Sequence, residues 1–189
     1  MRVPPTLPAD LSAEQRSLYD DMIDGIHANF KGFTAISKDG AMLGPFNPWG
    51  RWPQWGGPIW ELTKSLSVSP GLPRPVREVA ILVTGAKFRS AYQIYAHVII
   101  AENRGLSDDK ISTIIVGERP PDLTREESIA YDVASALVGG HVLPELTYRQ
   151  AVGAFGEEGA TELIYLVGFY CFVSVTLNGF DVPVPNAGD

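Results

Sequence analysis

The stretch REVAILVTGAKFRSAYQIYAHVIIAENRG, residues 77–105, predicts two apolar helices joined by a short turn near residues 87–89. The first helix opens with a carboxylate, Glu78, in a run of otherwise apolar residues. The second helix carries Gln93 and His97 four residues apart, a spacing that places both side chains on one helical face. A pair of apolar helices that presents a few proton-handling groups is a candidate site.

The rest of the chain also predicts helices. Ser12 with Gln15, and Thr124 with Glu127, form the pattern of a capping box at a helix start. Apolar residues at helical spacing then indicate helices over residues 12–30, 59–67, 107–116, 124–138, 145–154 and 157–177. No segment alternates polar and apolar residues between hairpin turns, so the sequence predicts an all-α bundle of about seven to eight helices.

The chain predicts one domain preceded by a short arm. Three prolines favour an extended arm over residues 1–10, and residues 11–189 are expected to form a single helical domain. Residues 31–58 are expected to be a long irregular segment that is functional or interface-forming. Trp49, Trp52 and Trp55 in this segment either lie in a contact between subunits or pack over the core of their own chain, and some can do both.

Composition excludes several classes of function. The chain has 189 residues, 45% hydrophobic and 20% charged, with a net charge of −7, which argues against binding to nucleic acid or anionic lipid. The longest apolar run, residues 163–177, is shorter than the roughly 20 residues of a membrane-spanning helix. No signal peptide is evident, and the one cysteine, Cys171, cannot form an intrachain disulfide. We therefore expect a soluble cytoplasmic protein.

The string LPRPVREVAILVTGAKFRSAYQIYAHVIIAENRGLSDDKIS, residues 72–112, resembles the carboxymuconolactone decarboxylase / alkylhydroperoxidase D-like family. The shared pattern begins with a helix that follows a proline and carries a Glu near its start. A second helix bears a motif that begins with Tyr and ends with His, and a Gly-Leu-Ser turn then leads to a helix with an acidic start. The segments GPFNPWGRWP and FVSVTLNGFDVPVP fit the flanks of the same family, so the resemblance covers most of the chain from about residue 40 onward. It implies an all-helical subunit that assembles as a homotrimer or homohexamer.

The same resemblance places Glu78 at the early Glu of the family and His97 at its helix histidine. It also exposes two departures. Ser90 and Gln93 stand where the redox branch has two cysteines, so a peroxidase cycle through this motif lacks its thiolate. Gln93 also replaces the Glu of the decarboxylase branch, and an amide cannot carry a proton away. Cys171, in an apolar helix, is expected to be an inert core residue.

The remaining residues predict acid–base chemistry. Glu78 and His97, on adjacent helices, can form a general acid–base pair in which the carboxylate fixes the imidazole tautomer. A structural interpretation stays open for both, because Glu is common in a first helical turn and a lone His between helices is often a packing residue.

Four further residues are candidates for substrate binding. Gln93 is expected to bind a carbonyl or carboxylate or to make a structural hydrogen bond, and Tyr92 is expected to orient the substrate or to pack. Arg89 is a candidate cationic clamp beside two other arginines of the central helices, and Trp49 is a candidate aromatic contact. No phosphate loop, dinucleotide fingerprint or metal-ligand spacing is present, so we expect chemistry without a cofactor or metal.

These features predict a cofactor-independent lyase or isomerase that acts on a small carbonyl, lactone or carboxylate substrate. Two alternatives stay open. One is a peroxidase-type activity that depends on Cys171, which the missing cysteine pair disfavours. The other is a non-catalytic, oligomeric binding protein that has kept the fold.

Overall fold

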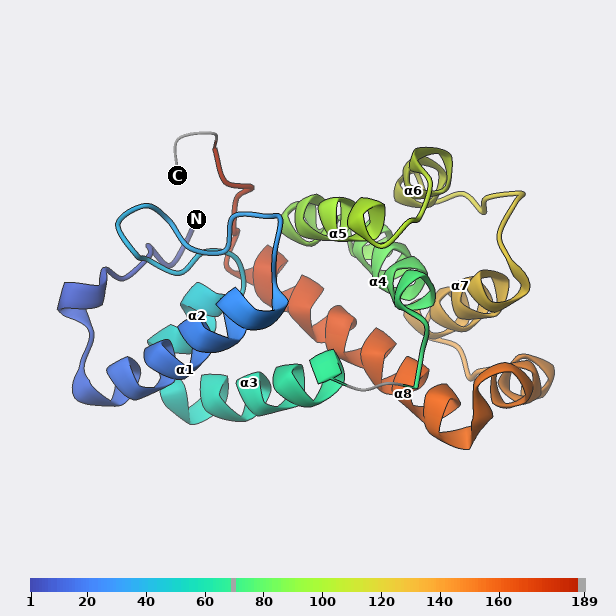
Figure 1. The fold of residues 1–189 in the computed structure, drawn as a ribbon, viewed down its shortest axis with the longest axis horizontal. Coiled ribbons are helices and arrows are strands. Elements are labelled where there is room, and N and C mark those ends of the chain that lie inside the picture. Colours follow the sequence, from blue (N-terminus) through green and yellow to red (C-terminus); the bar gives the residue numbers. More distant parts are fainter. Residues whose placement is uncertain (69–70, 187–189) are drawn as a thin grey trace. The chain divides into compact units, whose positions relative to one another are not determined.

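The computed structural model describes residues 1–68 and 71–186, and across these residues the chain is all-α (Figure 1). The described chain contains one short 3-10 helix and eight α-helices. The elements are η1 (Pro8–Asp10), α1 (Ala13–Asn29), α2 (Phe46–Arg51), α3 (Pro53–Val68), α4 (Arg74–Phe88), α5 (Ala91–Asn103), α6 (Asp108–Ile115), α7 (Arg125–Val138) and α8 (Glu145–Gly179). The predicted fold class and helix number are confirmed.

Both predicted capping boxes are present. The Ser12 side chain accepts a hydrogen bond from the backbone N–H of Gln15, whose own side chain accepts one from the Ser12 N–H. Thr124 and Glu127 make the same reciprocal pair at the start of α7. Each box satisfies two backbone donors that a helix start would otherwise leave free, which is why these helices begin where the sequence predicts.

The predicted irregular segment over residues 31–58 is wrong in its second half, because α2 and α3 occupy most of residues 46–68. The prolines of this segment favoured an irregular structure in the prediction, but two of them lie at helix starts. Pro53 is the first residue of α3, where its missing N–H costs nothing, and Pro48 lies within the first turn of α2. The helix predicted for residues 59–67 therefore starts six residues earlier, at Pro53.

The chain divides into two compact units, and each is described by itself. The first unit takes Met1–Val68 and Thr176–Asp189, and the second takes Ser69–Val175. In the first unit, Phe46 packs edge to face on Trp49 and Trp60, with ring centroids 5.7 and 6.2 Å apart. Aromatic pairs in this geometry add to the stability gained from burial alone.

The predicted arm belongs to the first unit and is tied down there. The Arg2 backbone N–H donates to the Phe180 carbonyl, and the Asn47 side chain donates to the Val3 carbonyl. Residues 8–10 of this arm form the 3-10 helix η1 instead of extended chain. Proline at the start of η1 favours this turn.

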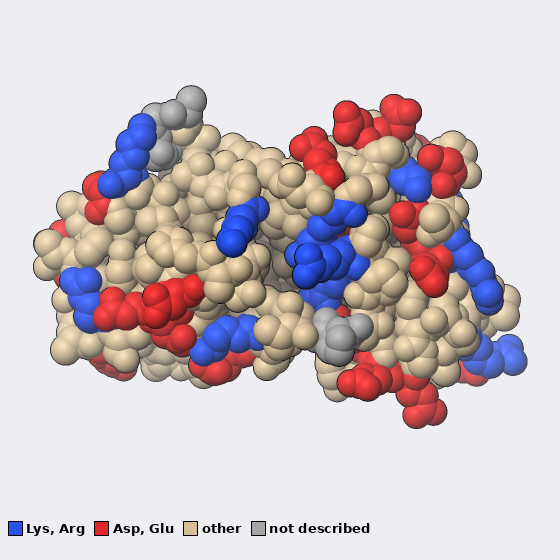
Figure 2. Space-filling model, viewed as in Figure 1, with Lys and Arg blue, Asp and Glu red and all other residues tan. Residues whose placement is uncertain are grey.

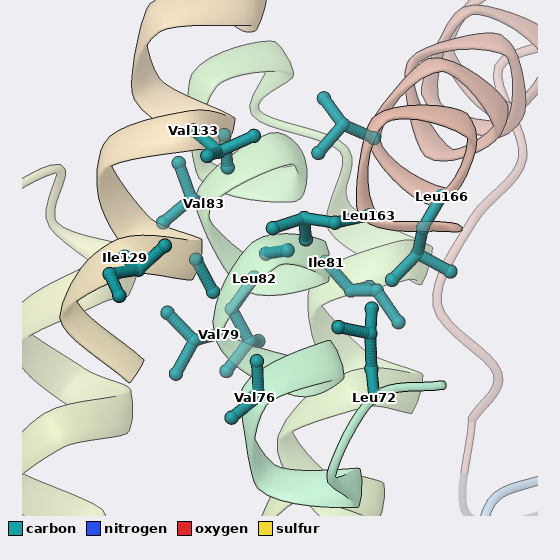
Figure 3. Packing of buried hydrophobic residues seen from close by; sticks show 14 of the residues in the cluster. Leu72, Val76, Val79, Ile81, Leu82, Val83, Ile129, Val133, Leu163 and Leu166 are labelled. Carbon is teal, nitrogen blue, oxygen red and sulfur yellow. The ribbon is translucent and has the colours of Figure 1, made fainter. Parts of the chain in front are cut away.

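The second unit is built around α4, which is buried on every side from Val76 to Gly85. Figure 3 shows its apolar side chains, Leu82 among them, between those of α7 and α8, which include Val133 and Leu163. This part of α4 has no solvent face, so its neighbours must cover it completely. This arrangement fixes α4 as the element against which the site is positioned.

The long helix α8 is broken near its middle, as the sequence predicts. Gly156 has φ 72° and ψ 175°, a backbone conformation that glycine adopts without a steric penalty. By length and composition α8 also meets the criteria for a membrane-spanning helix, with half of its most apolar 18-residue window buried. Leu163 and Leu166 lie in the hydrophobic core, and core helices of soluble proteins meet the same criteria.

Candidate acid–base site

Helix α4 holds Glu78 in its second turn, and the side chain is completely buried. A buried carboxylate is stable only where its charge is paired and its oxygens are hydrogen-bonded. Both conditions are met here. Oε2 lies 2.8 Å from Nδ1 of His97, and Oε1 accepts a hydrogen bond from the Arg104 guanidinium at 2.5 Å.

Helix α5 presents His97 to this carboxylate. The His97 side chain retains 11% of its exposure, and its ring meets that of Tyr170 edge to face, with centroids 4.9 Å apart. Because a carboxylate oxygen can only accept, the Nδ1 nitrogen must carry the proton it donates to Glu78. In the neutral ring the lone pair then lies on Nε2, which has no hydrogen-bond partner among the described residues. The Nε2 lone pair is therefore the one that can accept a proton.

Sequence reasoning missed Arg104. The residue follows His97 by seven positions, so the two lie on the same face of the helix two turns apart. Arg104 stands just past the last residue of α5, and its side chain is 28% exposed. The helical spacing is the signal in the sequence that places Arg104 near His97.

A second buried ion pair lies beside the first. Arg77 of α4 bonds to Glu162 of α8, and both residues are buried. Burial, and to a lesser degree the Glu78 carboxylate, raises the pKa of the Tyr170 phenol, although Arg77 and Arg104 act in the opposite direction. Tyr170 therefore stays protonated and can donate a hydrogen bond close to His97.

The structure places Gln93 in the core of the second unit. Its amide nitrogen donates to the Ile81 carbonyl at 3.2 Å, and its amide oxygen accepts from the Ser174 hydroxyl at 2.8 Å. These bonds link α4, α5 and α8 and favour the structural alternative for this residue. Its role in substrate binding stays a prediction.

Ser90 occupies the N-cap position of α5, but its side chain makes no cap hydrogen bond. The side chain is fully buried and its hydroxyl has no hydrogen-bond partner among the described residues. The Ser90 ψ of 97° lies well below the values of 147–166° at the N-caps of η1, α1, α6 and α7.

The other three predicted binding residues lie in different surroundings. Tyr92 is 2% exposed, and its ring packs edge to face on Tyr95 at 5.8 Å. Arg89 is exposed and ends α4 with a left-handed backbone, about 16 Å from Glu78 at 1.5 Å per residue along the helix. Trp49 belongs to the first unit, where it packs on Phe46. A contact between any of these residues and a substrate stays a prediction.

No group of three or more His, Cys, Asp and Glu side chains that could hold a metal ion occurs among the described residues. Cys171 of α8 is half-buried, and burial raises the pKa of its thiol. Because the thiolate is the reactive form, a raised pKa lowers its reactivity at neutral pH.

Cys171 is accordingly expected to react with iodoacetamide several-fold more slowly than free cysteine near neutral pH. The folded-state pKa lies above the ordinary value, so the rate should rise at a higher pH than it does for free cysteine. Mass spectrometry of the alkylated protein over a pH series measures this rate. A Cys171 that reacts as fast as free cysteine, or faster, would restore the peroxidase alternative.

Comparison with known proteins gives structural matches only. No protein-family model and no curated protein matches the chain. Its structure is similar to that of the debrominase Bmp8 in complex with 2,3,4-tribromopyrrole, with a TM-score of 0.75, 14% identity, and coverage of 100% of this chain and 94% of that one. The apo form of the same debrominase matches with a TM-score of 0.74 and 14% identity over 98% of this chain and 93% of that one.

A third structure is a protein of unknown function from Agrobacterium tumefaciens, described as a candidate antioxidant defence protein AhpD. It matches with a TM-score of 0.66 and 16% identity, over 76% of this chain and 99% of that one.

Proposed function

The chain has the carboxymuconolactone decarboxylase / alkylhydroperoxidase D-like fold, and from this premise we propose that it is a cofactor-independent lyase or isomerase. The substrate is a small carbonyl, lactone or carboxylate compound. One observation carries the proposal: a buried Glu78 carboxylate, paired with Arg104, accepts the Nδ1 proton of His97 at 2.8 Å and leaves Nε2 as a base. The fold supports small-molecule chemistry, since a structural neighbour is a debrominase described with a bound halogenated pyrrole.

The chemistry proceeds by proton transfer at Nε2 of His97. This nitrogen takes a proton from a carbon beside a carbonyl, and the C–H electron pair moves into the carbonyl to form an enolate. Return of the proton to a different carbon gives an isomer. In a decarboxylation, Nε2 first takes a proton from solvent, and the carbanion left by departing CO₂ then takes that proton from the imidazolium. Glu78 stabilises that imidazolium, and Tyr170 donates a hydrogen bond to the developing oxyanion.

Exchange of carbon-bound hydrogen for deuterium in D₂O tests this proposal without knowledge of the natural substrate. Wild-type protein is incubated with a panel of small lactones, keto acids and dicarboxylates, and ¹H NMR follows the loss of C–H signals beside each carbonyl. We expect exchange on at least one compound, abolished by His97→Ala and retained by His141→Ala, which alters an exposed histidine. Exchange that survives in the His97→Ala protein would refute the assignment.

A non-catalytic binding protein is the second candidate, and Gln93 is the observation that favours it. The residue at the position of the motif acid is used for internal hydrogen bonds to Ile81 and Ser174. This candidate predicts that some panel compounds bind the protein while none exchanges.

We further propose the homotrimer or homohexamer that the family resemblance implies, with α8 as part of the subunit contact. Residues 163–177 contain no charged side chain, yet Tyr165, Phe172 and Val175 are 64%, 42% and 56% exposed. Their spacing puts them on one face of the helix, which supports burial against a second copy.

Light scattering coupled to size-exclusion chromatography tests this assembly. Phe172→Glu is expected to shift the protein toward monomer, because it places a charge in the apolar contact. Glu158→Gln, at an exposed position of the same helix, is the matched control. A wild-type protein that elutes as a monomer would contradict the proposal.

A further inference from the structure

A pocket of about 640 Å³, open to solvent, lies on the surface of the second unit, where the C-terminal ends of α4, α6 and α7 meet. Val83, Ile114 and Val138 contribute to an apolar wall, and the Tyr131 ring and Ser135 hydroxyl line the same space. The volume falls in the range of sites for small organic ligands, which combine an apolar lining with a few polar groups. None of the acid–base residues described above lines this pocket.

Two cations, Lys87 and Arg89, line the pocket, and its lining contains no carboxylate. Both side chains are exposed to solvent, and neither has an ion pair or a side-chain hydrogen bond among the described residues. The chain as a whole carries a net charge of −7, and Figure 2 shows acidic side chains gathered over α6, whose first turn holds Asp108 and Asp109. The pocket at the opposite end of α6 is therefore a local concentration of unpaired positive charge.

Arg89 also has an unusual backbone conformation. This residue has φ 51° and ends α4 in the left-handed region, where glycine is the ordinary choice because a Cβ is disfavoured. A cation near the end of a helix also offsets the helix dipole, but Lys87 already lies in the last turn of α4. Offsetting the dipole therefore does not explain why an arginine occupies a position suited to glycine.

We propose that this pocket is a second ligand site, which takes a small aromatic or aliphatic carboxylate. The apolar part of the ligand packs on Val83, Val138 and the Tyr131 ring, and the carboxylate is held by Arg89 and Lys87. The guanidinium carbon of Arg119 lies 5.1 Å from the centroid of the Tyr131 ring, and the guanidinium pairs with Asp132. These two contacts hold the Tyr131 side of the pocket in place. The site lies at the far end of α4 from Glu78, so it is independent of the proposed function.

Calorimetric titration with benzoate and octanoate tests the site, with the neutral benzamide as a control for charge. We expect both carboxylates to bind and the double variant Lys87→Gln/Arg89→Gly to lose about tenfold or more in affinity, as removal of charge-assisted contacts predicts. Glycine adopts the left-handed conformation at position 89 without the steric strain of a Cβ. This variant should therefore keep its fold, and its melting temperature should be no lower than that of the wild type. Arg149→Gln, at an exposed arginine of α8, should bind like wild type.

NMR spectra of ¹⁵N-labelled protein locate the bound benzoate. Chemical-shift changes centred on residues 83–89, 114–117 and 131–138 would support the proposal. Three results would overturn it: benzamide binding as tightly as benzoate, wild-type affinity in the double variant, or shift changes centred on Glu78 and His97. Absence of binding at benzoate concentrations on the order of 10 mM, beyond the range of a specific small-ligand site, would overturn it as well.

Discussion

Glu78→Gln is expected to lower the rate of His97-dependent proton exchange by about 100-fold or more, as loss of a positioned acid–base unit predicts. The substitution keeps the size of the side chain but removes the charge that pairs with Arg104 and stabilises the imidazolium. It also allows the amide to donate to Nδ1, which would place the His97 proton on Nε2 and block the base. The exchange assay in D₂O measures the rate directly.

The matched control for this prediction is Glu102→Gln. Glu102 is an exposed carboxylate on α5, the helix that carries His97, so its substitution should leave the rate unchanged. Circular dichroism establishes whether each variant is folded. A folded Glu78→Gln protein with the wild-type rate would mean that the carboxylate is structural and that His97 does not need it.

Leu163→Ala is expected to lower the free energy of unfolding by about 2–5 kcal/mol. The Leu163 side chain is fully buried and packs in the core of the second unit with residues of α4 (Figure 3). Truncation removes its apolar contacts and leaves a cavity that the rigid neighbours fill only in part. Urea denaturation followed by circular dichroism measures the change.

Leu146→Ala is the control for this second prediction, since Leu146 lies on the same helix but is 62% exposed. Its substitution should change the free energy of unfolding by less than about 0.5 kcal/mol. Equal losses in the two variants would contradict the placement of Leu163 at the centre of the core.

Helix starts that depend on local chemistry were predictable from the sequence. Ser12 with Gln15 and Thr124 with Glu127 each carry their capping partner three residues away, so a short window contains the whole signal. The break near Gly156 was likewise predicted as a gap between two helices. The start of α3 at Pro53 was missed, because proline both ends helices and begins them, and tertiary packing decides between the two.

The site was predictable only in part for a related reason. The family resemblance identified Glu78 and His97, and in the structure Oε2 of Glu78 lies 2.8 Å from Nδ1 of His97. Arg104 and the internal bonds of Gln93 depend on how α4, α5 and α8 pack, and residues far apart in the sequence supply the partners. Periodicity assigns a residue to a helix face, but it does not give the identity of the residue across from it.

The tautomer of His97 tests the central claim most directly. Two-dimensional ¹H–¹⁵N NMR of the imidazole, recorded over a pH series that includes the neutral ring, distinguishes the protonated from the unprotonated nitrogen. Our account predicts the proton on Nδ1, held by Glu78, and an unprotonated Nε2. A ring that carries its proton on Nε2 would contradict it, because that nitrogen would then have no lone pair with which to act as a base.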